Sequence, residues 1–392
     1  MTDANAGRSP KALAKVERMN RALRHQEPDR VPMGEFFWGG FLRRWRAELG
    51  LPPDTDPYQY YDLDWVVTVP NMDPHIKPFE VVHESPDETT VRTGFEAVVH
   101  KRFDLPMPEA VSWDTDSLEK LEAFAFDDPR DRRRCYEPGD NQIGGVGDGF
   151  RRDCPAWLDT VKALRRNYAV YGSIIEASEC LTRLIGQMNT LMWMGEEPER
   201  FGRQVLRIGE FYLECLREEL DAGKGLLDGM VIWGDVAYAA NMFFSPDYWR
   251  TWYKPAVAGM ISLCHEHGLP VIYHGCGNVA SILPDFIEMG LDAYNPLEAK
   301  AGLDVVALRR QYGHKIAFCG NGDMRVWESG NMDAVRREVL RKLNAARGGG
   351  YIFQSDHSVS SGVSGRTYDY IVKLVHEYGV YPLDLGEYNE ET

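Results

Sequence analysis

The stretch that decides the fold is residues 270–296, which read PVIYHGCGNVASILPDFIEMGLDAYNP. Residues 270–274 form a short run dominated by apolar side chains, which predicts a buried strand. Residues 279–289 carry apolar side chains at helical spacing, and residues 293–296 predict a second strand. A helix between two short strands indicates a β–α–β unit, in which the two strands run parallel.

The same alternation continues on both sides of this unit. Further strands are predicted at residues 31–37, 64–69, 168–176, 230–235, 315–319 and 351–354. Helices are predicted at residues 12–25, 181–194, 198–222, 246–267, 305–312 and 332–346. Strands that alternate with helices in this number favour closure of a parallel sheet. We therefore predict an α/β fold, a single (β/α)8 TIM barrel over residues 12–385, between a disordered N-terminal tail (1–11) and a C-terminal tail (386–392).

The first part of the chain departs from this alternation, which predicts N-terminal helical insertions and a β-hairpin. Residues 79–83 and 90–102 alternate apolar and polar side chains around a turn-like segment, as hairpin strands do. Residues 104–153 are rich in Pro, Asp, Arg and Gly, and we expect loops and short helices there. Residues 144–149, GGVGDG, resemble a phosphate cradle, but no convincing strand precedes them, which argues against a nucleotide site.

Composition and charge exclude several classes of partner. The 392 residues include 44 Lys and Arg against 60 Asp and Glu, a net charge of −16. Phosphate surfaces repel such a chain, so we expect a small-molecule substrate and neither nucleic acid nor a membrane. No stretch approaches the roughly eighteen apolar residues of a membrane span, and the polar start lacks the apolar segment of a signal peptide. The seven scattered cysteines favour reduced thiols, so we expect a cytoplasmic protein.

Residues able to bind metal follow several of the later strands, at the end where barrel enzymes form their active sites. Zn²⁺ prefers imidazole and thiolate ligands, and a catalytic site uses three protein ligands with one open position. His274 and Cys276 supply two such ligands from one short segment, and His357 and Cys319 are both open as the third. The alternative for each is a structural role, because strand-end histidines often only hydrogen-bond a loop and cysteines are often buried.

Several stretches carry a resemblance to a known family. They are VERMNRAL at 16–23, PDRVP at 28–32, HGCGN at 274–278, GLDAYNP at 290–296, GN at 320–321, GGGYIF at 348–353 and EYG at 377–379. With them the chain, from about residue 15 to residue 383, resembles the uroporphyrinogen decarboxylase superfamily. True decarboxylases of that superfamily carry an RQAGRY segment early in the barrel, whose arginines hold substrate carboxylates. Residues 34–40 of this chain read GEFFWGG instead, which points away from porphyrinogen decarboxylation.

The other branch of the superfamily contains the cobalamin-linked (corrinoid) methyltransferases. They bind zinc through a His-x-Cys motif and a distant cysteine near the last strand. His274 and Cys276 match the first two ligands, and near the last strand this chain has His357. The resemblance therefore implies zinc held by His274, Cys276 and His357, with Cys319 as the alternative third ligand.

The resemblance implies a zinc-dependent enzyme that moves a methyl group between a small methylated substrate, or a thiol acceptor, and a corrinoid carried by a partner protein. Because the third ligand is an imidazole, we favour a methyl ether substrate, and therefore O-demethylation. In this scheme Asp235 and Glu298 orient the substrate or manage a proton. Asn278, Glu176 and Cys319 are predicted to contact the substrate. A homodimer is also implied.

Two alternatives stay open at this point. The first is a metal-free decarboxylase or lyase of a carboxylated small molecule, in which Arg43, Arg44 and Arg46 would hold the carboxylate. The second is a non-catalytic barrel that binds a corrinoid or another ligand, because a fold by itself does not determine an activity.

Overall fold

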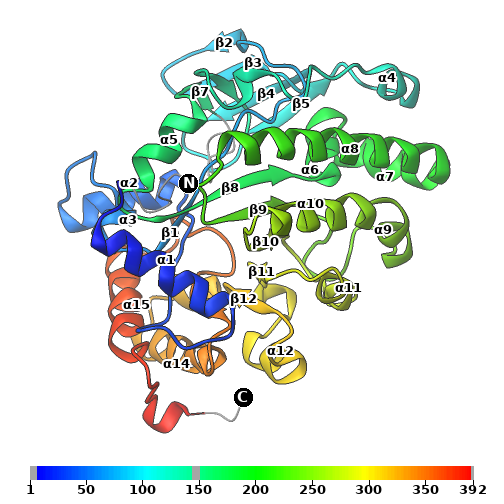
Figure 1. Ribbon diagram of the computed structural model, residues 1–392. Helices are drawn as coiled ribbons and strands as arrows, with labels where there is room; N and C mark the ends of the chain where they lie inside the picture. Colours follow the sequence, from blue (N-terminus) through cyan, green and yellow to red (C-terminus); the bar gives the residue numbers. More distant parts are fainter. Residues whose placement is uncertain (1–6, 144–150, 390–392) are drawn as a thin grey trace.

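A seven-stranded parallel sheet forms the centre of the computed structural model, which describes residues 7–143 and 151–389 (Figure 1). The strands follow one another around the sheet in the order β1-β8-β9-β10-β11-β12-β13. Their bounds are β1 (Trp65–Val67), β8 (Ala169–Ile175), β9 (Gly229–Trp233), β10 (Val271–His274), β11 (Ala293–Asn295), β12 (Ala317–Cys319) and β13 (Tyr351–Ile352). Each coincides with a predicted strand, with β9 beginning one residue earlier than expected, so the predicted α/β barrel architecture is confirmed.

The segment predicted as the first strand, residues 31–37, closes the sheet without being a regular strand. The amide of Phe353, just after β13, donates to the carbonyl of Pro32 at 2.8 Å. On the other side the amide of Asp64, just before β1, donates to the carbonyl of Met33 at 2.9 Å. Pro32 has no N–H group to donate to a neighbouring strand, so this segment pairs with the sheet through isolated β-bridges. The segment therefore joins the two edges of the sheet.

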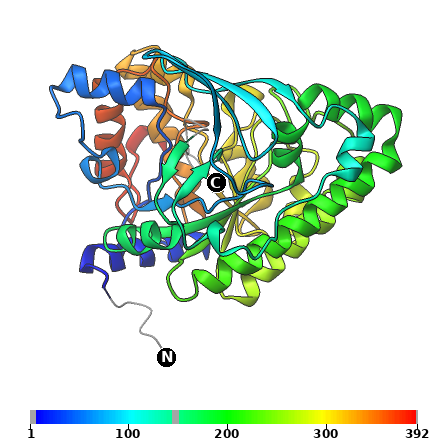
Figure 2. The same cartoon turned by 90° about the horizontal axis from the view of Figure 1, so that it is seen from above.

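Helices surround the sheet on its outer face (Figures 1 and 2). The α-helices are α1 (Pro10–Leu23), α2 (Gly39–Leu49), α3 (Pro57–Tyr60), α4 (Leu118–Ala123), α5 (Trp157–Leu164), α6 (Ala177–Leu184), α7 (Gln187–Glu196), α8 (Pro198–Ala222), α9 (Pro246–Trp252), α10 (Lys254–Glu266), α11 (Leu283–Glu288), α12 (Val305–Tyr312), α13 (Met324–Glu328), α14 (Met332–Leu343) and α15 (Gly365–Tyr378). Short 3-10 turns are η1 (Arg132–Arg134), η2 (Ala299–Ala301), η3 (Asn344–Ala346) and η4 (Gly386–Tyr388).

Two predicted helices are each divided in the structure. The helix predicted at 181–194 separates into α6 and α7 at Gly186, whose φ of 81° lies outside the helical region. The helix predicted at 246–267 separates into α9 and α10, and a proline opens α10 because its ring cannot continue the hydrogen bonds of a preceding helix.

The barrel interior is filled with side chains, so it is a core rather than a channel. Helix α1 covers the end at which the strands begin, where its Met19 and Leu23 are buried against the interior residues. The interior residues alternate along their strands with residues that face the outer helices. They are Phe36, Trp65, Ala169, Tyr171, Val231, Ile272, Ala293, Ala317, Cys319 and Ile352.

An antiparallel sheet makes a separate layer above β8 and α8 in Figure 1 and lies over the barrel in Figure 2. Its strands are β2 (Glu80–Glu84), β3 (Glu88–Arg92), β4 (Ala97–Arg102) and β5 (Glu109–Trp113). The predicted hairpin is confirmed but was too small, because residues 90–102 fold back at 93–96 and β5 adds a fourth strand. Strands β6 (Gly139–Asn141) and β7 (Arg151–Cys154) pair nearby, and the glycine-rich residues 144–149 lie outside the described residues.

The first and last described residues contact the barrel more closely than the predicted tails suggest. Helix α1 begins at Pro10, and Arg8 forms an ion pair of 2.7 Å with Asp228 before β9. The prediction of a disordered tail is therefore wrong for residues 8–11, while residues 1–6 lie outside the described part. Toward the C-terminus, Nδ2 in the side chain of Asn344 donates to the carbonyl of Tyr388 in η4 at 2.8 Å.

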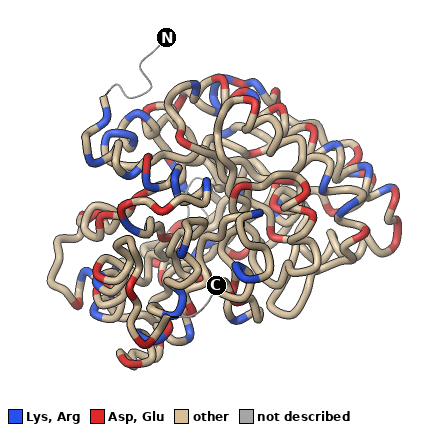
Figure 3. Tube along the Cα trace, turned by 60° about the horizontal axis from the view of Figure 1, so that its bottom comes forward, with Lys and Arg blue, Asp and Glu red and all other residues tan. Residues whose placement is uncertain are grey.

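Acidic and basic residues are interspersed along the trace rather than separated into large regions of one sign (Figure 3). Within residues 7–143 and 151–389, none of the helices combines the length and the apolar character that crossing a bilayer requires.

Candidate functional site

A pocket of about 160 Å³ lies at the end of the barrel where the strands finish. Its walls are largely aromatic and aliphatic, and its polar groups come from the ends of β9 and β10, from α6 and from the segment after β13. The lining residues are Phe36, Trp38, Met107, Ile143, Ile175, Glu179, Arg183, Trp233, Asp235, His274, Cys276, His357 and Ser358. Four residues of the predicted site, Asp235, His274, Cys276 and His357, therefore share this pocket.

The side chain of His274 points into the barrel because side chains along a strand alternate between its two faces. Ile272 of β10 belongs to the interior core, so His274, two residues further on, faces the same way. Its register partner on β11 is Asn295. Because the two residues lie side by side, Nδ1 of His274 is 2.5 Å from Oδ1 of Asn295.

The amide group of Asn295 is itself held in one orientation. Its Nδ2 donates to the carbonyl of Cys319 at 3.0 Å and to Oε1 of Gln354 at 3.3 Å. Its Oδ1 therefore faces the imidazole and accepts a hydrogen bond from Nδ1 of His274. This bond leaves the lone pair of the histidine on Nε2, which is the atom closer to Cys276.

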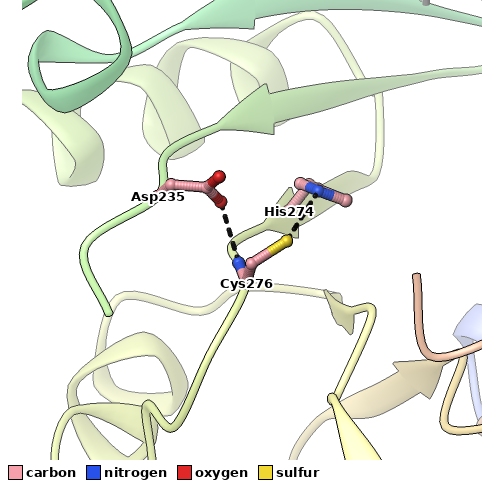
Figure 4. Close-up of side chains that lie close together, drawn as sticks. All are labelled: Asp235, His274 and Cys276. Carbon is pink, nitrogen blue, oxygen red and sulfur yellow. Dashed lines mark hydrogen bonds between the residues drawn. The ribbon is translucent and has the colours of Figure 1, made fainter. Parts of the chain in front are cut away.

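Cys276 lies on a tight loop between two glycines. The φ of Gly277 is 82°, and a Cβ at this position would be 2.6 Å from the backbone of both Ala237 and Tyr238. Only glycine fits that close approach. The amide of Cys276 donates to Oδ1 of Asp235 at 2.8 Å, which fixes the loop against the end of β9 (Figure 4).

The electrostatics of the pocket favour a bound cation. Burial, with Asp235 and Glu298 nearby, raises the pKa of the Cys276 thiol well above its usual value. Burial, followed by the charge of Glu179, raises the pKa of Asp235 to about 7. Burial lowers the pKa of His274, and burial with the neighbouring His274 lowers that of His357 to about 4. Neutral imidazoles beside several carboxyl groups are suited to a metal ion, which would also stabilise the thiolate.

Two overlapping groups of side chains could hold that ion. One is Asp235, His274 and Cys276, and the other is Cys276, Glu298 and His357, with the ligand atoms of each group within 4.8 Å of one another. Sγ of Cys276 is 3.7 Å from Nε2 of His274 (Figure 4). A tetrahedral zinc about 2.1 Å from nitrogen and about 2.3 Å from sulfur separates such atoms by about 3.6 Å. The two residues therefore fit a zinc ion without rearrangement.

The carboxylates in these groups have other partners. Asp235 accepts the amide of Cys276, and Oε1 of Glu298 lies 3.1 Å from the ammonium of Lys300. His357 packs against Trp38 with ring centroids 5.4 Å apart. Within the described residues its imidazole has no hydrogen-bond or ion-pair partner, so its nitrogens are available for coordination.

The three residues predicted to contact substrate do not line the pocket. Cys319 is buried in the barrel interior, where its Sγ lies 3.1 Å from Oε1 of Gln354, and it belongs to neither ligand group. Asn278 donates to the carbonyl of Ala301 at 3.0 Å. Glu176 is buried and accepts the hydroxyl of Ser178, and burial raises its pKa to about 8. These positions indicate structural contacts for all three.

Sequence reasoning missed the polar pair on the other wall of the pocket. Glu179 and Arg183, one turn apart on α6, form an ion pair and both line the pocket. Their i,i+4 spacing directly after a predicted strand was the available signal. Among the residues that the structure describes, Arg183 is the one arginine in the lining, so Arg43, Arg44 and Arg46 do not serve there.

Comparisons with known proteins agree with the resemblance found in the sequence. A family model described as uroporphyrinogen decarboxylase (URO-D) matches residues 145–378. A uroporphyrinogen decarboxylase of Geobacillus kaustophilus is 26% identical over 190 residues, 48% of this chain and 51% of the relative. That of Syntrophotalea carbinolica is 26% identical over 255 residues, 57% of this chain and 65% of the relative. The chain thus spans between half and two thirds of the length of these curated relatives.

The structural comparison extends over nearly the whole chain. A methyltransferase from Methanosarcina mazei superposes with a TM-score of 0.59 at 16% sequence identity, covering 93% of this chain and 98% of that one. At this level of identity the likeness concerns the fold. It supports the α/β barrel architecture of this chain.

Proposed function

This chain belongs to the uroporphyrinogen decarboxylase family, and from that premise we propose that it is a zinc-dependent methyltransferase acting with a corrinoid. The observation that carries the proposal is the 3.7 Å separation of His274 Nε2 and Cys276 Sγ at the base of the pocket. An imidazole and a thiol at tetrahedral spacing, with a third donor beside them, are the ligand set of a zinc site with an open position.

We assign the ligands as His274, Cys276 and His357. The assignment of His357 rests on its place in the pocket lining, on its ligand group with Cys276, and on an imidazole that has no hydrogen-bond partner among the described residues. His274 and His357 belong to different groups, so a side-chain rotation would bring both to one ion. Glu298 is less suited because Lys300 pairs with it, and Asp235 because it already accepts the amide of Cys276. When bound, the zinc would supply Lewis acidity at the substrate atom that carries the methyl group.

The remaining lining residues suit a small substrate that is mostly apolar. Phe36, Trp38 and Trp233 form aromatic walls that exclude water from the reacting atoms. Glu179 and Arg183 offer one acceptor and several donors on the opposite wall, which would fix the orientation of a polar group on the substrate. We therefore propose a small methyl ether as the substrate class, with Asp235 assisting its orientation.

The corrinoid would act from outside the pocket. A cavity of about 160 Å³ is far smaller than a corrinoid macrocycle, so the cofactor would have to approach the pocket mouth. A separate carrier protein is the natural source of a cofactor presented in this way. Loss of the methyl group from an ether would leave an alkoxide, which would take a proton and depart as the alcohol, while the corrinoid would supply the nucleophile that takes the methyl group.

Elemental analysis and a spectroscopic assay test this function together. We expect about one zinc per chain in purified protein, lost in Cys276→Ala and retained in the matched control Cys319→Ala. With cob(I)alamin and a panel of small methyl ethers, the visible spectrum should convert to that of methylcob(III)alamin. Native protein free of zinc would overturn the proposal.

A metal-free decarboxylase is the alternative that the names of the curated relatives favour. Its signature would be release of carbon dioxide from a carboxylated substrate by protein stripped of metal. Binding of cobalamin without any methyl transfer would instead indicate a non-catalytic barrel.

A further inference from the structure

Glu35 carries a carboxyl group that is buried inside the barrel wall without a cation beside it. Its exposed fraction is 2%, and burial raises its pKa to about 8. Within residues 7–143 and 151–389 its hydrogen-bond partners are amides and hydroxyl groups rather than a lysine or arginine. A carboxyl group in such a place costs stability unless its oxygens are hydrogen-bonded, so the segments that supply its partners are held together around it.

The carboxyl group of Glu35 binds the turn that leads to His357. Its Oε1 lies 2.6 Å from the hydroxyl oxygen of Ser355, and its Oε2 accepts the backbone amide of Ser355 at 3.2 Å and the hydroxyl of Tyr368 at 3.3 Å. The Ser355 hydroxyl also contacts the carbonyl oxygen of His357, and because it has a single hydrogen, it accepts from the protonated carboxyl group of Glu35 when it donates to His357. One hydroxyl thus connects the carboxyl group to the backbone of the histidine.

Glu35 also fixes the opposite wall of the pocket. The amide of Phe36 donates to Oε1 of Glu35 at 2.9 Å, and the Phe36 ring lines the pocket. The centroid of that ring lies 6.1 Å from the ring of His274 and 5.6 Å from that of Trp233. The carboxyl group therefore joins two segments separated by 320 positions in the sequence, one on each side of the ligands.

We propose that Glu35 is a positioning residue that holds His357 in place for the pocket, acting through Ser355. The zinc part of this inference rests on the proposed function, whereas the placement of the His357 ring does not. Partners behind a metal ligand set its orientation, and their loss typically weakens metal binding by about 10- to 100-fold.

Glu35→Gln and Ser355→Ala test the connection from its two ends. The amide of glutamine keeps the size of the side chain but replaces one oxygen with an NH2 group, which cannot accept the backbone N–H of Phe36 or Ser355 as either carboxyl oxygen does, protonated or not. Alanine at position 355 removes the hydroxyl. We expect each variant to weaken zinc binding by about 10- to 100-fold. The double variant should bind zinc as well as the single variant with the lower affinity, because both substitutions break the same connection. Cobalt(II) in place of zinc should show a changed visible spectrum in both.

Glu219→Gln is the matched control. Glu219 on α8 is as buried as Glu35, with an exposed fraction of 1%, and its Oε1 accepts the amide of Ser173 at 2.9 Å. In the part of the chain that the structure describes, its hydrogen bond is to Ser173, which does not line the pocket, so this substitution should alter stability and leave zinc affinity within about twofold.

A second readout uses no metal. In metal-free protein the NMR resonances of the His357 ring, assigned by substitution, should shift or broaden in Glu35→Gln and in Ser355→Ala but not in Glu219→Gln.

Unchanged zinc affinity, cobalt spectrum and His357 resonances in Glu35→Gln and Ser355→Ala would overturn the positioning role. If wild-type protein binds no zinc, the proposed function fails, and the His357 resonances still decide whether Glu35 positions the ring. Should Glu35→Gln not fold, Ser355→Ala carries the test alone.

Discussion

Nδ1 of His274 donates a hydrogen bond to Oδ1 of Asn295 over 2.5 Å, between register partners on adjacent strands. This contact selects the tautomer in which Nε2 carries the free lone pair, and the orientation of Asn295 is fixed in turn by Cys319 and Gln354. A residue without a place in the pocket lining therefore determines which atom of His274 can bind a metal.

Asn295→Leu removes the acceptor behind His274 while retaining a side chain of similar size. We expect zinc affinity to fall by about 10- to 100-fold, because the imidazole loses both its orientation and its preferred tautomer. Competition with a chromophoric chelator measures the change. Asn278→Ala, at a nearby asparagine that bonds to Ala301 instead, is the control and should bind zinc normally. Equal affinities in both variants would contradict the role of Asn295.

His357→Ala and Cys319→Ala distinguish the two residues that remained open as the third ligand. His357 lines the pocket, whereas Cys319 faces the barrel interior, so we expect zinc to be lost or weakened at least about 100-fold only in His357→Ala. Metal content after dialysis and the cobalt(II) spectrum give the answer. Loss of zinc in Cys319→Ala alone would reverse the assignment.

Gly277→Ala should disturb the loop that carries Cys276. Its positive φ of 82° costs about 1 kcal/mol for alanine, and overlap with the backbone of Ala237 and Tyr238 adds to it, for about 2–4 kcal/mol in all. Gly50→Ala, at a φ of 65° with no atom within 4 Å of the new Cβ, isolates the cost of the dihedral at about 1 kcal/mol. Urea denaturation compares them. Equal losses would show that the close approach does not matter.

Glu219→Gln should change how stability depends on pH. Burial raises the pKa of Glu219 well above its usual value of 4.5, so the folded protein keeps a proton that the unfolded chain releases. The free energy of unfolding of the wild type therefore falls as pH rises above about 4.5. Glutamine does not titrate, so the variant should gain stability relative to wild type between pH 5 and pH 8. A difference that is the same at both values would rule out this explanation.

The division of the predicted helices and the insertion sheet show where sequence patterns were insufficient. Helical periodicity continues across Gly186, but one dihedral angle there ends α6. Residues 90–102 alternate as one strand would, yet the chain turns back at 93–96 and forms two. The spacing of apolar residues indicates which side chains are buried, but it does not indicate where the backbone reverses direction.

The sequence by itself determined the barrel, the family and the pairing of His274 with Cys276. These follow from local information, because periodicity specifies strands and helices and a two-residue spacing keeps two ligands together. Tertiary structure alone decided that His357 enters the pocket while Cys319 faces the interior. It also decided that Asn295 hydrogen-bonds to His274 and Glu35 to Ser355. Those outcomes depend on the register between neighbouring strands and on contacts between segments far apart in the chain, which no local pattern contains.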